Sequence, residues 1–126
     1  MSINRFLLIL LIISNVSCGV SAKSNVSCKS DEESLVCIRA SSLIVNSEIK
    51  KIIVNIEKST DNKQQFQTAQ IKWQAYKNSY CRDFIGAEAT YTQGDGATKI
   101  VESCLLSIDK ERLDELRRLN RVYSVQ

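Results

Sequence analysis

A chain of 126 residues is long enough for one domain, and its formal net charge of +3 is too mild to indicate a protein that binds nucleic acid. The sequence contains no histidine, which excludes catalysis by an imidazole base and most common zinc sites. It also contains no proline, which fits long uninterrupted helices.

Residues 1–22 have the layout of a secretory signal peptide. Arg5 gives the start a positive charge, and the apolar run 6–13 that follows is too short to span a membrane. The tripeptide Val20-Ser21-Ala22 places small residues at the positions that signal peptidase reads. We therefore expect cleavage after Ala22, which leaves residues 23–126 as one exported domain.

Cys18 allows a second interpretation of this segment. A lipoprotein signal also ends at a cysteine that follows a small residue, and Ser17 supplies that residue. However, Asn15 stands where such signals usually carry leucine. We therefore expect plain cleavage, with no lipid anchor at Cys18 and no membrane span in the exported protein.

The first helix is expected from about Asp31 to Lys58. Ser30 and Glu33 have the spacing of a capping box, in which each side chain bonds to the backbone of the other. The segment 49–56 is rich in β-branched residues, which also favour strands, but it lacks the alternation of a strand. Steps of three and four predict one buried face, made of Leu35, Ile38, Ser42, Val45, Ile49, Ile52 and Ile56.

The second helix is expected from about Lys63 to Phe84, and its apolar face is aromatic. This face holds Phe66, Ala69, Trp73, Tyr76 and Tyr80 at helical spacing. Because aromatic side chains bury large areas, we predict that Trp73 and Tyr76 form the centre of a small core. A sugar-stacking platform is the less favoured interpretation of the same rings, because helical spacing is typical of a core.

All three glycines beyond the signal peptide fall between the second and third helices, at Gly86, Gly94 and Gly96. Gly86 is predicted to end the second helix, and residues 87–97 are predicted to form a loop. The third helix should then run to about Tyr123. Asp95 or Thr98 can cap its first turn.

Three helices with short connections predict an all-α fold, a small antiparallel three-helix bundle. Four cysteines remain after removal of the signal peptide, and an even number in a short exported chain implies two disulfides. Of the three possible connectivities we favour Cys81–Cys104, which would staple the hairpin between the second and third helices. Cys28 and Cys37 then form a local pair.

The second and third helices contain an ordered set of residues: Ala69-Gln70, Trp73, Tyr76, Cys81, the Gly94-Asp95-Gly96 loop, Cys104-Leu105 and the segment 112–116. In this order they resemble the bacterial envelope domains called lysozyme inhibitor LprI-like. The similarity covers about Gln65 to Leu119. It departs at Lys77-Asn78, where the family carries Arg-Asp, and around residues 46–53 of the first helix.

The resemblance implies an exported protein, periplasmic or secreted, that binds and inhibits lysozyme without being an enzyme. No catalytic residue, metal ligand or cofactor is predicted. We expect the loop 87–97 to make the contact. Its candidate binding residues are Tyr91 as the aromatic anchor, with Thr90, Thr92 and Asp95 as hydrogen-bonding groups.

Two alternatives use other residues. A non-catalytic envelope module that binds or assembles exported proteins would need an apolar patch, which Ile44, Ile53 and Val54 of the first helix could form. An enzyme would need a carboxylate pair, for which only acids on predicted helix surfaces or in the loop are available. We favour the inhibitor over both alternatives.

Overall fold

The computed structural model describes Cys28 and residues 34–124, and its described elements are all helices. They are α1 (Leu35–Ser59), α2 (Lys63–Asn78), the π-helix η1 (Ser79–Ile85), α3 (Gly86–Glu88), the 3-10 helix η2 (Ala89–Tyr91) and α4 (Gly96–Tyr123). From α2 to η2 the helical turns continue without a break, and we call residues 63–91 the second helical segment.

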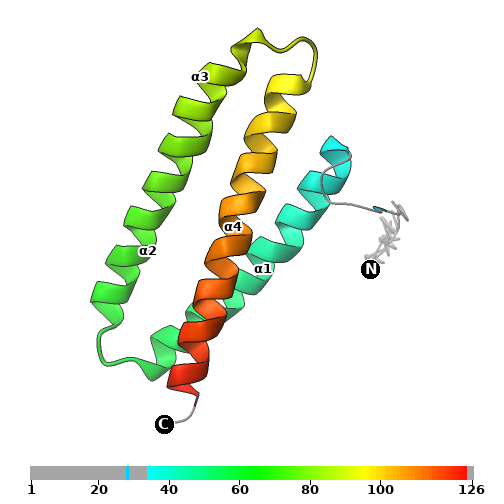
Figure 1. Ribbon diagram of the computed structural model, residues 1–126. Helices are drawn as coiled ribbons and strands as arrows, with labels where there is room; N and C mark the ends of the chain where they lie inside the picture. The colour runs from blue at the N-terminus through cyan, green and yellow to red at the C-terminus, as the bar shows by residue number, and fades with distance from the viewer. Residues whose placement is uncertain (1–27, 29–33, 125–126) are drawn as a thin grey trace, which may run out of the picture.

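The predicted antiparallel three-helix bundle is confirmed. Figure 1 shows α1 and α4 running in the same direction, with the second helical segment antiparallel to both. The hairpin between that segment and α4 closes at one end of the molecule, and the turn from α1 to α2 lies at the other. Among the described helices, none is both long and apolar enough to cross a membrane.

The first helix begins later than predicted, at Leu35. Ser34 is extended (φ −141°, ψ 150°), and its hydroxyl accepts a hydrogen bond from the Cys37 amide at 3.2 Å, so Ser34 is the N-cap. The predicted capping box at residues 30–33 lies outside the described residues. So do the predicted signal peptide and Cys18.

The core lies between α1 and α4. Its buried residues are Ile38, Val45, Ile49, Ile52 and Ile56 of α1 with Leu106, Leu113 and Leu116 of α4. The predicted periodicity of α1 is therefore correct for all five of these isoleucine and valine positions. Phe66 is the member of α2 that packs against this cluster, so α2 contributes little to the apolar core.

The prediction that Trp73 and Tyr76 form the centre of the core is wrong. Trp73 is partly buried but lies outside the core cluster, and Tyr76 is 59% exposed. The buried contact between α2 and α4 is instead an ion pair, in which Lys77 Nζ lies 2.8 Å from Asp109 Oδ1. A charged pair fills the place that the aromatic rings would have taken.

The π-helix keeps one line of residues directed at α4. Trp73, Lys77, Cys81 and Ile85 are spaced by four, and four residues overshoot one α-helical turn by roughly 40°. Cys81 lies in η1, and because a π-helix has more residues per turn, it offsets part of this rotation and keeps Cys81 on the α4 side with Lys77. Gly86 continues the helix at φ −61°, so its predicted role as a C-cap is wrong.

Both predicted disulfides are present. Cys81 and Cys104 join the second helical segment to α4 with a Cα–Cα distance of 5.7 Å, and Cys28 and Cys37 lie 5.6 Å apart. The first bond closes a loop of sequence separation 23, and the second one of 9. Loop-closure entropy makes the longer crosslink the more stabilising of the two.

We predict that replacing Cys81 and Cys104 together by alanine lowers the unfolding free energy by ~3 kcal/mol. Urea denaturation of the oxidised proteins measures the loss. The matched control replaces Cys28 and Cys37, and its loss should be smaller because the loop is shorter. Equal midpoints for the Cys81/Cys104 variant and the wild type would contradict the prediction.

Candidate functional site

The hairpin between the second helical segment and α4 ends in a narrow tip (Figure 1). We call residues 87–97 the tip loop. Helix persists through Tyr91, so only residues 92–95 are irregular, fewer than predicted. Gly94 reverses the chain with φ +65°, a left-handed conformation that favours glycine. Ala89 is buried and anchors the tip against the rest of the hairpin.

Several short contacts restrain this tip. The Thr92 amide and hydroxyl both donate to the Ala89 carbonyl, at 3.0 and 2.7 Å. A Cβ at Gly96 would lie 3.1 Å from Thr92 Cβ, so glycine allows the two chain segments to approach each other. With the Cys81–Cys104 bond at its base, the tip is held from both sides.

The four predicted binding residues lie together at this tip, and all are exposed: Thr90, Tyr91, Thr92 and Asp95. Tyr91 is 89% exposed, more than any other large apolar or aromatic residue described. The Thr90 hydroxyl donates to the Ala87 carbonyl at 2.8 Å, and Asp95 occupies the N-cap of α4 without a side-chain capping bond. The tip thus offers one ring, two hydroxyl oxygens and one carboxylate to a partner.

A cleft between α2 and α4 was missed by the sequence analysis. We call it the α2–α4 cleft; its volume is about 310 Å³, and Trp73, Tyr76, Ile108, Glu111, Arg112, Glu115 and Arg118 line it. The Arg112 guanidinium lies 5.4 Å from the centre of the Trp73 ring and donates through Nη1 to the Glu115 carboxylate. Its Nε is buried and has no acceptor among the residues that the structure describes.

Beyond the cleft, three neighbouring rings follow the second helical segment; the first pair is stacked and the second is tilted. The ring centres of Tyr76 and Tyr80 are 5.9 Å apart, and those of Tyr80 and Phe84 are 5.8 Å apart. The three residues are 59%, 40% and 55% exposed. Both tyrosines were predicted on the buried face of this helix, because helical spacing alone does not tell which face a neighbouring helix covers.

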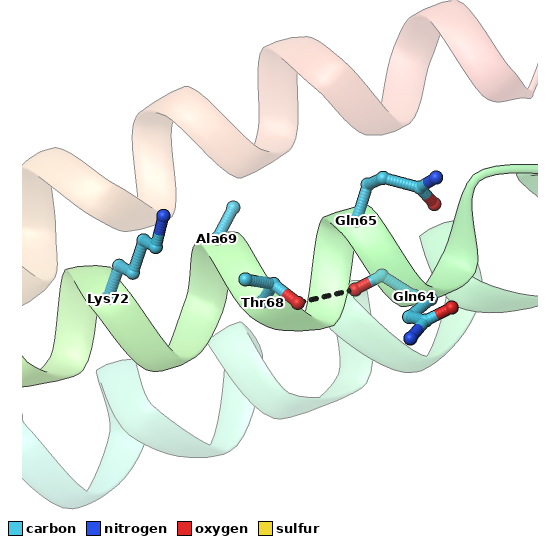
Figure 2. A pocket seen from close by; sticks show the side chains of 5 residues that line it. All are labelled: Gln64, Gln65, Thr68, Ala69 and Lys72. Carbon is cyan, nitrogen blue, oxygen red and sulfur yellow. Dashed lines mark hydrogen bonds between the residues drawn. The ribbon is translucent and has the colours of Figure 1, made fainter.

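A polar hollow of about 490 Å³ adjoins the cleft along α2, lined by Gln64, Gln65, Thr68, Ala69 and Lys72. In Figure 2, Gln65, Ala69 and Lys72 extend toward the side on which α4 runs, and Thr68 donates to the Gln64 carbonyl. Lys72 lies one helical turn before Tyr76, so the hollow and the cleft follow one flank of α2.

The apolar patch predicted on α1 is present in part. Ile44 is 70% exposed and Val54 is 46% exposed, whereas Ile53 packs against the core. Among the described residues, no group of three or more histidine, cysteine or acidic side chains could hold a metal ion. In the part of the chain that the structure describes, polar and aromatic groups come together at the tip loop and in the α2–α4 cleft.

The family model described as lysozyme inhibitor LprI matches residues 24–116, which is more than half of the chain. The chain belongs to the lysozyme inhibitor LprI family. Neither the comparison with curated proteins nor that with solved structures gave a match.

Most of the residues that carry the LprI resemblance lie at the tip of the hairpin, at its base and in the α2–α4 cleft. Cys81 and Cys104 form the disulfide at the base of the hairpin, and the Gly94-Asp95-Gly96 segment turns the tip. Four further motif residues, Trp73, Tyr76, Arg112 and Glu115, line the α2–α4 cleft, whereas Gln70 and Asp114 do not. The LprI motif residues therefore fall on both candidate surfaces.

Proposed function

We propose that this protein is an exported, non-catalytic inhibitor that binds lysozyme through the tip loop. Membership of the lysozyme inhibitor LprI family supports the class of activity. The observation that supports the site is Tyr91, whose side chain is almost fully exposed at the apex of a hairpin closed by a disulfide. An exposed ring on a restrained support is the kind of residue that dominates binding energy at protein interfaces.

The mechanism of such an inhibitor is steric and needs no bond-making. Lysozyme hydrolyses a glycan with two carboxyl groups that flank the scissile bond in a cleft. A narrow convex tip can occupy that cleft and exclude the substrate. In this proposal Tyr91 fills a subsite, while the Thr90 and Thr92 hydroxyl oxygens and the Asp95 carboxylate accept hydrogen bonds from the cleft walls. Because the tip is already restrained, it loses little conformational freedom on binding.

Export is part of the proposal. The apolar run 6–13 and the tripeptide 20–22 fit a signal peptide, and the two disulfides fit an oxidising compartment such as the periplasm. Without Arg5 of the signal peptide the net charge is +2 (16 basic minus 14 acidic residues), which gives no long-range attraction to a basic enzyme. We therefore expect affinity to come from short-range contacts, with little dependence on salt.

We predict that Tyr91→Ala weakens lysozyme binding by ~2 kcal/mol, about thirtyfold, because an interface anchor is removed. Calorimetric titration of purified lysozymes into the oxidised protein, with no glycan present, measures this directly. The matched control is Tyr76→Ala, which removes an exposed ring away from the tip and should leave lysozyme affinity unchanged.

The outcomes separate the activity from its site. If the wild-type protein binds and inhibits no lysozyme from any class tested, the inhibitor proposal is wrong. If the wild type inhibits and Tyr91→Ala inhibits equally well, the activity stands and the tip loop is not the contact. Unchanged melting of Tyr91→Ala confirms that any loss is local, as expected for a residue without core contacts.

A further inference from the structure

We propose that the α2–α4 cleft is a saccharide-binding site for an N-acetylated amino-sugar oligosaccharide that carries a carboxylate. The site needs no lysozyme, so this proposal and the proposed inhibition can fail independently. It rests on one exposed ring, one guanidinium that lines the cleft, and the acidic and basic side chains around it. Each of these groups matches one chemical feature of such a sugar.

The aromatic surface of the cleft is supplied by Tyr76. Trp73 is not free to stack on a ligand, because Lys77 Nζ lies 4.9 Å from its ring centre and the Arg112 guanidinium lies 5.4 Å away. Tyr76 stacks with Tyr80 but remains 59% exposed, so much of its ring is accessible. The apolar face of a pyranose can pack against that accessible ring.

Arg112 is the group that would recognise a carboxylate. Its side chain is only 11% exposed, and Trp73 and Glu115 hold it in place. Glu115 takes the hydrogen bond from Nη1, but the buried Nε has no acceptor among the described residues. Nε itself is enclosed by the protein, so a carboxylate in the cleft would meet the part of the guanidinium that lines it. A guanidinium fork also suits the planar geometry of a carboxylate.

The remaining polar groups provide acceptors and fix the charge. Glu111 and Glu115 can accept hydrogen bonds from sugar hydroxyls and from an acetamido N–H. These two negative charges are opposed by three positive charges, on Arg112 and Arg118 in the cleft and on Lys72 in the adjoining hollow. One positive charge is in excess, which favours a ligand with one negative charge over a neutral sugar or a polyanion.

The extent of the surface favours a saccharide chain over a peptide. The cleft of about 310 Å³ and the polar hollow of about 490 Å³ follow each other along α2, and in the hollow uncharged Gln64, Gln65 and Thr68 offer further hydrogen bonds. A second sugar unit would find donors and acceptors there. A peptide would need pockets for apolar side chains, and Ile108 is the single aliphatic residue that lines the cleft.

The experiment titrates the oxidised protein with two disaccharides by calorimetry and by NMR. The first is the N-acetylglucosamine–N-acetylmuramic acid unit, which carries a carboxylate, and the second is the N-acetylglucosamine dimer, which carries none. We expect the first to bind at least tenfold more tightly. Tyr76→Ala and Arg112→Lys should each weaken its binding about tenfold or more, since the lysine keeps the charge but loses the fork.

The matched control is Ile71→Ala, which changes an equally accessible residue of α2 that does not line the cleft and should bind as the wild type does. If Arg112→Lys loosens the fold, Tyr76→Ala still tests the site, because Tyr76 is exposed and its removal should not disturb the core. Absence of binding to the acidic disaccharide would overturn the proposal. Equal binding of both disaccharides would also overturn it, and so would undiminished binding by Tyr76→Ala. A wall-derived peptide without sugar that displaces the disaccharide equally well would overturn it too.

Discussion

Replacing Asp109 by alanine is expected to lower the unfolding free energy by about 3–5 kcal/mol, because it leaves the Lys77 ammonium buried without its partner. Lys77 Nζ and Asp109 Oδ1 are 2.8 Å apart, and the two side chains are only 8% and 3% exposed. The nearby Trp73 ring attracts the ammonium but does not replace a carboxylate. Urea denaturation followed by circular dichroism measures the loss.

Two comparisons show whether burial is the cause. Glu48→Ala breaks the ion pair between Arg117 and Glu48, whose side chains are 44% and 40% exposed, and should change stability far less because water solvates both groups. Arginine is charged at neutral pH with or without this partner. The hydrogen bond to Glu48 raises the pKa of Arg117 further above its ordinary value.

The second comparison is the double variant Lys77→Met with Asp109→Leu. Two apolar side chains of similar volume need no hydrogen-bond partner, so we expect the double variant to be much more stable than Asp109→Ala alone. If Asp109→Ala is no less stable than Glu48→Ala, the ion pair does not contribute to the fold as its burial indicates. If the double variant is as unstable as the single one, the loss comes from packing and not from the unpaired charge.

The α1 helix shows what periodicity can predict. Its apolar residues recur at steps of three and four, and Ile38, Val45, Ile49, Ile52 and Ile56 are all buried, because a face of short aliphatic chains packs wherever another apolar face meets it. The disulfides were predictable for a related reason. Once the second and third helices were placed, Cys81 and Cys104 had to lie on the two arms of one hairpin.

The second helical segment shows where the same reasoning fails. Helical spacing places Trp73, Tyr76 and Tyr80 near one another, but it does not say what the facing helix offers. At this level α4 presents Asp109, far away in the sequence, and Lys77 turns inward to meet it. A buried ion pair between distant residues leaves no local signal, so the aromatic residues were assigned to a core from which the pair displaces them.

The candidate sites differ in the same way. The tip loop was predictable as an exposed turn, because three glycines and several polar residues gather between two helical patterns. The α2–α4 cleft was not, since it exists only where Trp73 and Arg112 meet across two helices. Arg112 interrupts the apolar face of α4 in the sequence, and that interruption was the one available signal.

The location of the core leads to a final prediction about stability. Leu116 is fully buried between α1 and α4, so Leu116→Ala should lower the unfolding free energy by about 2–5 kcal/mol through lost burial and the cavity that remains. Trp73→Ala should cost less, although tryptophan is the larger residue. Trp73 is only half-buried, and water can solvate the Arg112 guanidinium when its ring is removed.

Urea denaturation of both variants at equal protein concentration gives the ranking, and Val122→Ala serves as a control because Val122 is 63% exposed. A larger loss for Trp73→Ala than for Leu116→Ala would place the centre of stability between α2 and α4 and contradict the core described here. Amide hydrogen exchange tests the same point without mutation. Because Phe66 is the α2 residue that packs on the α1–α4 cluster, the amides of α2 should exchange faster than those of α1 and α4.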